Sequence, residues 1–218
     1  MKSIAILLLC FLLLSCGSLT YFESPNHLRN VDGTLHLQNG RSVTGKLVVQ
    51  TDNFLGSPVK VYSEGDKKPM QFKLANVKGY SINHEQYELK EIREGISLGR
   101  QRFFMRRLTP PNSRLHLYEH LKKETVNKTA TRYQVEHYLQ LPGEEEALVH
   151  AATGSRFVPN FDKKMSQVVA DCPLLATKIA AREDGYFYAQ VSLLKEKRLL
   201  VLLQIIDEYN QCAPVGSP

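Results

Sequence analysis

Residues 33–49, GTLHLQNGRSVTGKLVV, carry the pattern that decides the fold. Leu35 and Leu37 alternate with polar residues, as in a strand that buries one face. Asn39-Gly40 is a two-residue turn typical of tight hairpins, and a second apolar run follows it. The stretch therefore predicts a β-hairpin.

Short apolar segments with turn residues between them continue on both sides of residue 100. Their spacing of about 8–12 residues is typical of antiparallel sandwiches and barrels. The predicted strands are 59–62, 70–74, 77–82, 87–92, 103–108, 115–121, 133–139 and 147–150. We therefore predict an N-terminal antiparallel β-rich domain over residues 31–155, either a sandwich or a partly open barrel.

After Gly154 the apolar residues follow a helical period. Asn160 or Asp162 can cap a helix that ends at 169, and Asp171 can cap a second that has Pro173 close to its first turn. A third helix is predicted over 189–209. Its segment LLVLLQII is apolar nearly all round, which requires burial on more than one side. Residues 156–218 are thus predicted as a bundle of about three helices, which makes the fold α+β.

The first residues form a leader. Lys2 supplies one positive charge, and 4–14 is an apolar run of about a dozen residues, shorter than the roughly 20 that span a bilayer. Small residues follow at Ser15 and Gly17, where a processing enzyme must fit the backbone. We predict a removable signal peptide over 1–15.

The end of this leader, Leu13-Leu14-Ser15-Cys16, resembles the lipobox of bacterial lipoproteins. The resemblance implies cleavage before Cys16, a diacylglycerol on its sulfur and an acyl chain on the new amino group. Stable anchoring to a membrane needs more than one acyl chain. The alternative is an ordinary signal peptide with an incidental cysteine. Residues 16–30 would be a tether between the lipid and the folded body.

Together with the segment NGRSVTGKLVV and the final YNQC, the lipobox resembles lipoproteins of unassigned activity that are common in Bacteroidota. In some lipoproteins an acidic run after the cysteine signals surface export, and residues 17–21 contain none. The resemblance therefore implies an anchor in the bacterial cell envelope, on the outer membrane and facing the periplasm.

The chain has 28 Lys and Arg against 22 Asp and Glu, a formal net charge of +6. Such an excess can indicate nucleic acid as a partner, but an exported, tethered protein meets little of it. An envelope protein or an anionic envelope polymer is the better expectation, and a merely solvated basic surface is the simplest one.

Cys172 and Cys212 remain besides the proposed anchor, and exported chains mature in an oxidising compartment. Cys172 begins a predicted helical segment and Cys212 follows the last helix. A disulfide would tie the helices together and contribute about 2–4 kcal/mol. Two unbonded structural thiols and a reactive cysteine are the alternatives, although no motif places a histidine base beside either residue.

The segment 116–120, HLYEH, matches H-x-x-E-H, the inverted zinc-protease signature. That chemistry needs both imidazoles on one turn of a helix. Here Leu115 and Leu117 alternate with polar residues and two prolines precede them, so the context predicts a strand with a solvated face. On a strand, His116 and His120 would lie roughly 13 Å apart, too far for one metal ion.

The segment 100–114, RQRFFMRRLTPPNSR, is rich in arginine. Its alternation favours a strand that buries Phe103 and Met105 and has a basic outer face. A patch for an anionic ligand or a membrane surface is the second interpretation, and nucleic acid is the least favoured. The candidate patch residues are Arg100, Arg102, Arg106, Arg107 and Arg114.

No glycine-rich phosphate loop, G-x-S-x-G elbow or CxxC motif occurs in the chain, and we predict no catalytic residue, metal or cofactor. The sequence favours a binding or structural module over an enzyme. The alternative is an envelope hydrolase or carrier whose site is built from scattered residues. Converging His, Glu or Asp side chains in a deep pocket would indicate the second, and a flat apolar or basic patch the first.

Overall fold

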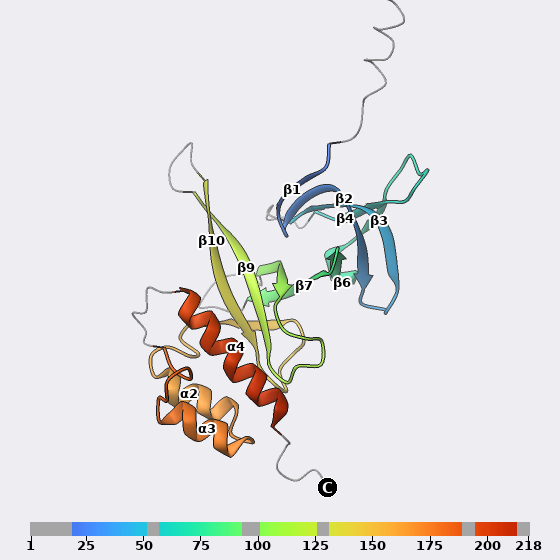
Figure 1. Cartoon of the computed structure of the whole chain (residues 1–218). Coiled ribbons are helices and arrows are strands. Elements are labelled where there is room, and N and C mark those ends of the chain that lie inside the picture. Colours follow the sequence, from blue (N-terminus) through green and yellow to red (C-terminus); the bar gives the residue numbers. More distant parts are fainter. Residues whose placement is uncertain (1–18, 52–56, 93–100, 126–130, 189–194, 213–218) are drawn as a thin grey trace, which may run out of the picture.

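The computed structural model describes residues 19–51, 57–92, 101–125, 131–188 and 195–212. The protein is a mixed α+β structure in which a curved sheet is followed by helices (Figure 1). The described strands are β1 Tyr21–Ser24, β2 His27–Leu37, β3 Ser42–Gln50, β4 Val59–Tyr62, β5 Met70–Phe72, β6 Val77–Ile82, β7 Glu85–Ile92, β8 Gln101–Arg107, β9 His116–Thr125, β10 Thr131–Gln140 and β11 Leu148–Ala151. The described helices are the 3-10 turn η1 Leu74–Asn76, α2 Phe161–Val168, α3 Pro173–Ala180 and α4 Lys195–Gln211.

The second half of the sheet closes into a barrel. Strands β7 to β10 are antiparallel neighbours in chain order, and β11 pairs antiparallel with β10 and parallel with β7. The closing register places Leu148 opposite Glu91, and the Glu91 amide donates to the Ala147 carbonyl at 2.7 Å. The predicted α+β class is confirmed. Of the two predicted β architectures, this half forms a barrel, which is closed rather than partly open.

The first half of the sheet extends from β7 in the order β6-β2-β3-β4-β5. Its centre is the predicted β2–β3 hairpin, which is confirmed. Gly40 has φ 82°, a conformation that favours glycine, and its amide donates to the Leu37 carbonyl at 3.1 Å. The buried residues of this half, with Leu35 and Leu47 fully enclosed, form a core of their own.

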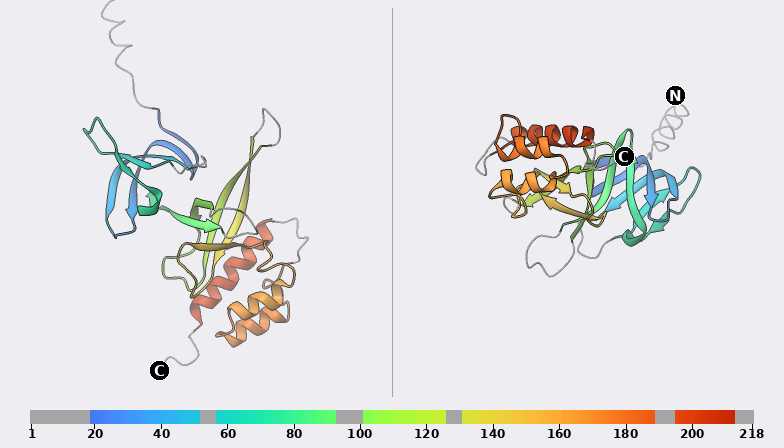
Figure 2. Two further views of the ribbon diagram at one scale, coloured as in Figure 1. Left: turned by 180° about the vertical axis from the view of Figure 1, so that it is seen from behind. Right: turned by 90° about the horizontal axis from the view of Figure 1, so that it is seen from below.

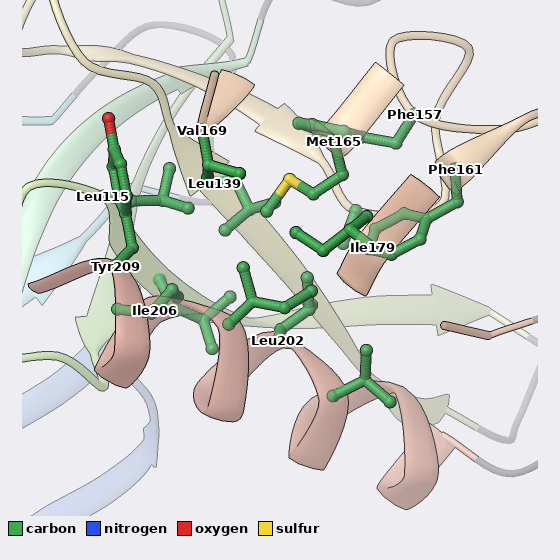
Figure 3. Packing of buried hydrophobic residues seen from close by; sticks show 14 of the residues in the cluster. Leu115, Leu139, Phe157, Phe161, Met165, Val169, Ile179, Leu202, Ile206 and Tyr209 are labelled. Carbon is green, nitrogen blue, oxygen red and sulfur yellow. The ribbon is translucent and has the colours of Figure 1, made fainter. Parts of the chain in front are cut away.

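A second large core lies between the barrel and the helices. Leu115, Leu117 and Leu139 are fully buried on the outer face of the barrel. Side chains of α4, among them Leu202 and Ile206, point towards them (Figure 3). The predicted burial of LLVLLQII on more than one side is only partly met, because Val201, Leu202, Ile205 and Ile206 are buried and Leu199 and Leu203 are partly buried, whereas Leu200 is 66% exposed.

The predicted helices correspond to α2, α3 and α4. Asn160 occupies the N-cap position of α2, one of the two alternatives, but its side chain makes no capping hydrogen bond; α3 begins after Cys172 rather than after Asp171. Residues 189–194, predicted as the start of the third helix, lie outside the described residues. Among the described helices, none has the length and apolar character needed to cross a bilayer.

The predicted disulfide is present. Cys172 and Cys212 are bonded, with their Cα atoms 6.0 Å apart. The bridge joins the residue before α3 to the residue after α4, and Cys172 is buried in the core beneath the helices.

Part of the predicted tether is folded. Residues 21–30 contain β1 and the start of β2, joined at the Ser24-Pro25-Asn26 turn. Asn26 is 2% exposed, and its side chain donates to the Phe104 carbonyl and accepts from the Phe104 amide. This polar turn looks like a linker in the sequence because its partner lies 78 residues away.

Strand β8 differs from its prediction. The alternation predicts one buried face with Phe103 and Met105, yet Phe104 is also fully buried. The reason is that β8 separates two cores: Met105 lies inside the barrel, and Phe104 packs with the first half of the sheet. The face of β8 that carries Phe104 was predicted to point to solvent, and at this residue it is buried.

Candidate functional site

A groove of about 1030 Å³ lies on the polar face of β2, β3 and β4. It is opposite the face that buries Leu47 and Val61. The residues that line it are Arg29, Asn30, Asp32, Thr44, Gly45, Lys46, Val48, Gln50, Lys60, Tyr62, Ser63, Glu64, Gly65 and Asp66. We refer to these residues as the β2–β4 groove.

Strand register builds the groove from two rows of side chains. Arg29, Val48 and Lys60 are cross-strand neighbours in one row. Asp32, Lys46 and Tyr62 form the other. Directly opposed residues of neighbouring strands point to the same face, so each row is continuous across the groove.

A β-bulge brings the two rows onto one face. Arg29 and Asp32 are three positions apart, and in a regular strand they would point to opposite faces. The pairing of β2 with β3 shifts between Arg29 and Val31, and Asn30 has φ 55°. The extra residue in β2 compensates for the odd spacing. The side chains of Arg29 and Asp32 therefore both point into the groove.

Only some of the charged side chains in the groove form ion pairs with other residues of the protein. Lys46 pairs with Asp32 at 3.3 Å across the two strands. Arg29, Lys60 and Tyr62 make no side-chain hydrogen bond or ion pair with another described residue. Glu64 and Asp66, in the turn after β4, likewise make no side-chain hydrogen bond or ion pair with another described residue, so two cations, two carboxylates and a phenol are available to a ligand on this face.

A second hollow, of about 660 Å³, lies between the β10–β11 connection and α2. Its charges are already satisfied within the protein. Glu144 accepts from His150 at 2.6 Å and pairs with Arg156 at 3.5 Å, while Lys164 donates to the Ser155 carbonyl at 2.7 Å. This hollow is a weaker candidate than the β2–β4 groove.

The barrel interior holds a charged cluster that the sequence did not reveal. Lys90 is 2% exposed and donates to Glu88 at 2.8 Å and to the Gln140 side chain at 3.0 Å. Its third donor reaches the Glu146 carbonyl at 2.7 Å. The Tyr118 hydroxyl donates to Glu88 at 2.9 Å.

These contacts set the protonation of the cluster. Burial lowers the pKa of Lys90, although Glu88 opposes that effect. Burial alone would raise the pKa of Glu88, but the attraction of Lys90 and of Arg107, 2.5 Å away, outweighs it and lowers that pKa. All three ammonium donors of Lys90 have acceptors, so Lys90 has no donor left for a ligand. We therefore assign the cluster a role in stabilising the closed ring of strands.

The H-x-x-E-H segment forms strand β9, as the context predicts, but the predicted solvated face is wrong, because Tyr118 is 1% exposed and lies in the barrel core. His120 is 4% exposed, and burial lowers its pKa to about 4, so the imidazole is neutral at pH 7. Its ring packs against Phe103 with centroids 4.6 Å apart. Among the described residues, no group of three His, Cys, Asp or Glu side chains is placed to hold a metal ion.

The arginines proposed as an anionic patch are dispersed among carboxylates. Arg100 lies outside the described residues, and each of the other four pairs with at least one acidic side chain. The pairs are Arg102 with Glu91 at 3.3 Å, Arg106 with Glu85 at 2.7 Å and Glu119 at 2.9 Å, Arg107 with Glu88 at 2.5 Å, and Arg114 with Asp171. An anion would have to displace these carboxylates, so the anionic patch stays a prediction without structural support.

Cys16, the proposed lipidation residue, lies outside the described residues. The chain matches no protein-family model, no curated protein and no solved structure. The β2–β4 groove is therefore characterised by its own geometry and charge.

Strand β1 is held against the barrel by one carboxylate. Glu23 accepts hydrogen bonds from the hydroxyls of Tyr133 and Tyr21, and it pairs with Lys123 at 3.2 Å. These contacts, with the Tyr133 hydrogen bond largest, lower the pKa of Glu23 to about 2. The carboxylate thus connects the N-terminal edge of the sheet to the β9–β10 hairpin.

This carboxylate predicts an acid-sensitive contribution to stability. A lowered folded-state pKa adds stability that is complete above the unfolded-state value of about 4.3 and is lost as the pH falls towards 2. We expect the free energy of unfolding to fall less between about pH 5 and pH 2 in Glu23→Gln than in the wild type. Urea titrations at several pH values measure this, and Glu64→Gln, in an exposed turn, should keep the wild-type profile. Parallel profiles for Glu23→Gln and the wild type would contradict it.

Proposed function

We propose that the protein is a lipid-anchored module of the bacterial cell envelope, held at Cys16 on the periplasmic face of the outer membrane. There it binds an anionic envelope component in the β2–β4 groove. The single observation that carries the binding function is the row in which Arg29 and Lys60 flank Val48 without a partner among the described residues. Charged side chains left available on one face of a rigid sheet are suited to recognition.

The row also sets the spacing of the ligand's charges. Arg29 and Lys60 stand on strands that are two steps apart, which corresponds to about 10 Å between their backbones. An anionic polymer, or a protein segment with two separated carboxylates or phosphates, can contact both cations at once. Tyr62, in the adjacent row, adds a flat apolar ring and a hydroxyl.

The alternative, an envelope hydrolase or carrier, has less support. Such a site would gather histidine and acidic side chains in one hollow. Neither the β2–β4 groove nor the hollow beside α2 is lined by a histidine. A smaller hollow of about 160 Å³ beside α4 is lined by Glu136 and His137. These are consecutive residues of β10, so their side chains point to opposite faces of the sheet and do not converge.

Photo-crosslinking in cells tests the binding function. A photoreactive amino acid at Tyr62 of the full chain should give a discrete adduct, and one at Lys197, exposed on α4, should not. Replacing both Arg29 and Lys60 with alanine should abolish the Tyr62 adduct, because the electrostatic contacts are lost. Digestion of the adduct with protease or glycosidase distinguishes a protein ligand from a polymer. An adduct that survives the double substitution would rule out recognition by this row.

A further inference from the structure

The first described residues present an exposed apolar edge. Leu19 is 86% exposed, Tyr21 47% and Phe22 45%. Tyr21 is opposite Arg29 and Phe22 is opposite Leu28 on β2, so the two aromatic rings lie on opposite faces of β1. With Leu19 just before the strand, apolar surface surrounds this end of the sheet.

This edge is fixed to the body rather than joined to it loosely. The Asn30 side chain donates to the Leu19 carbonyl at 3.3 Å, and the Thr20 hydroxyl donates to the Asn30 carbonyl at 3.3 Å. Phe22 also packs near Tyr87, with ring centroids 6.3 Å apart. The position of Leu19 is therefore determined by the sheet.

The distance to the proposed anchor is short. Cys16 precedes Leu19 by three residues, and three fully extended residues span about 10 Å. One polar layer is about 5–8 Å thick, half of the amount by which a whole bilayer exceeds its hydrocarbon core, so the tether is only slightly longer than that layer. If Cys16 carries a lipid, the β1 edge cannot move far from the headgroup region.

We propose that Leu19, Tyr21 and Phe22 form a membrane-docking edge that inserts into the lipid–water interface beside the anchor. This inference rests on the proposed lipidation of Cys16. Aromatic side chains favour that interface because their rings tolerate an environment between water and hydrocarbon. The lipid and the edge together fix the orientation of the body, whereas a lipid on a long tether would leave it free to rotate.

The orientation has a consequence for the β2–β4 groove. Arg29 and Asn30 line the groove, and both contact the β1 edge through strand pairing or hydrogen bonds. The groove would therefore open close to the membrane surface. Helices α3 and α4 lie at the opposite end of the molecule and would face away from the membrane (Figure 1, Figure 2).

The absence of tryptophan from the sequence permits a direct test. Single-tryptophan reporters are made at the edge, as Leu19→Trp and Phe22→Trp, and at a matched control, Leu200→Trp, which replaces a leucine that is 66% exposed on α4. Each full-length, processed protein is reconstituted in phosphatidylethanolamine and phosphatidylglycerol vesicles with and without brominated acyl chains. Mass spectrometry of the same samples reports whether Cys16 is acylated.

We expect brominated lipid to quench both edge reporters, with a blue shift of their emission, and to leave Leu200→Trp unchanged. Acylated protein whose edge reporters are not quenched, or are quenched no more than Leu200→Trp, would overturn the docking edge and leave the anchor intact. A blue shift of the edge reporters that grows with protein concentration, in the unacylated Cys16→Ser variant without vesicles or detergent, would indicate a second copy of the chain as the occupant and would also overturn the proposal. Protein without acylation on Cys16 would refute the anchor and the docking edge together.

Discussion

Replacement of Lys90 by methionine should lower the free energy of unfolding by about 3 kcal/mol, because breaking a buried ion pair leaves an uncompensated charge. Lys90 is 2% exposed and lies 2.8 Å from the Glu88 carboxylate. Methionine fills a similar volume but removes the positive charge and three hydrogen bonds. Arg107 still contacts the other oxygen of Glu88, which places the loss at the lower end of the usual 3–5 kcal/mol range.

Urea unfolding with the disulfide intact measures this loss, and two further variants interpret it. Adding Glu88→Gln to Lys90→Met should lower the free energy of unfolding further, because Arg107 then loses the carboxylate that it contacts at 2.5 Å. Lys122→Met removes an exposed pair with Glu136, whose atoms are 3.2 Å apart, and should cost less than about 1 kcal/mol. A loss from Lys90→Met no larger than that from Lys122→Met would show that the cluster contributes little to the barrel.

The parts of the fold that depend on local pattern could be predicted from the sequence. The β2–β3 hairpin follows from Asn39-Gly40 between alternating runs, and α2 follows from a helical period. The strand at 116–120 was also recognised, because two prolines precede it and its leucines alternate. In each of these cases the residues that specify the element lie within it.

The closed ring could not be predicted because it depends on contacts between distant segments. Its last pairing is parallel, between β7 and β11, and no turn residue marks it. Glu88 and Lys90 therefore read as the polar face of a strand, whereas ring closure makes that face the interior. The same reason explains Phe104, whose side of β8 is covered by the first half of the sheet.

The candidate site could be predicted even less well. The row of Arg29, Val48 and Lys60 depends on the register of three strands. The bulge at Asn30 shifts that register by one residue, and nothing in the segment distinguishes this asparagine from an ordinary turn or tether residue. The arginine-rich segment gave a stronger signal in the sequence, yet its charges pair with carboxylates of other elements, 11 to 57 residues away in the chain.

Removal of the disulfide should lower the free energy of unfolding by as much as Lys90→Met does, or by more. Replacing Cys172 and Cys212 with alanine frees a segment with a sequence separation of 40 residues. The loop-entropy relation for a loop of this length predicts a loss of about 4 kcal/mol in the free energy of unfolding, chiefly because the unfolded chain gains freedom. Urea unfolding of the double variant, compared with wild type in the presence and absence of reductant, measures this loss.

The bridge also acts within the folded protein, and this makes its local effect predictable. Arg114 donates to the Cys212 carbonyl at 3.0 Å, and its guanidinium lies 3.9 Å from the centre of the Tyr209 ring. The end of α4 is thus held both by the bridge and by Arg114, so the double alanine variant should keep its folded structure under native conditions. Hydrogen exchange should then rise most in α3 and at the end of α4, while amides of the β2–β3 hairpin, in a separate core, should change only through the lower global stability. Equal loss of protection throughout, without an excess at α3 and α4, would show that the bridge acts on the unfolded chain alone.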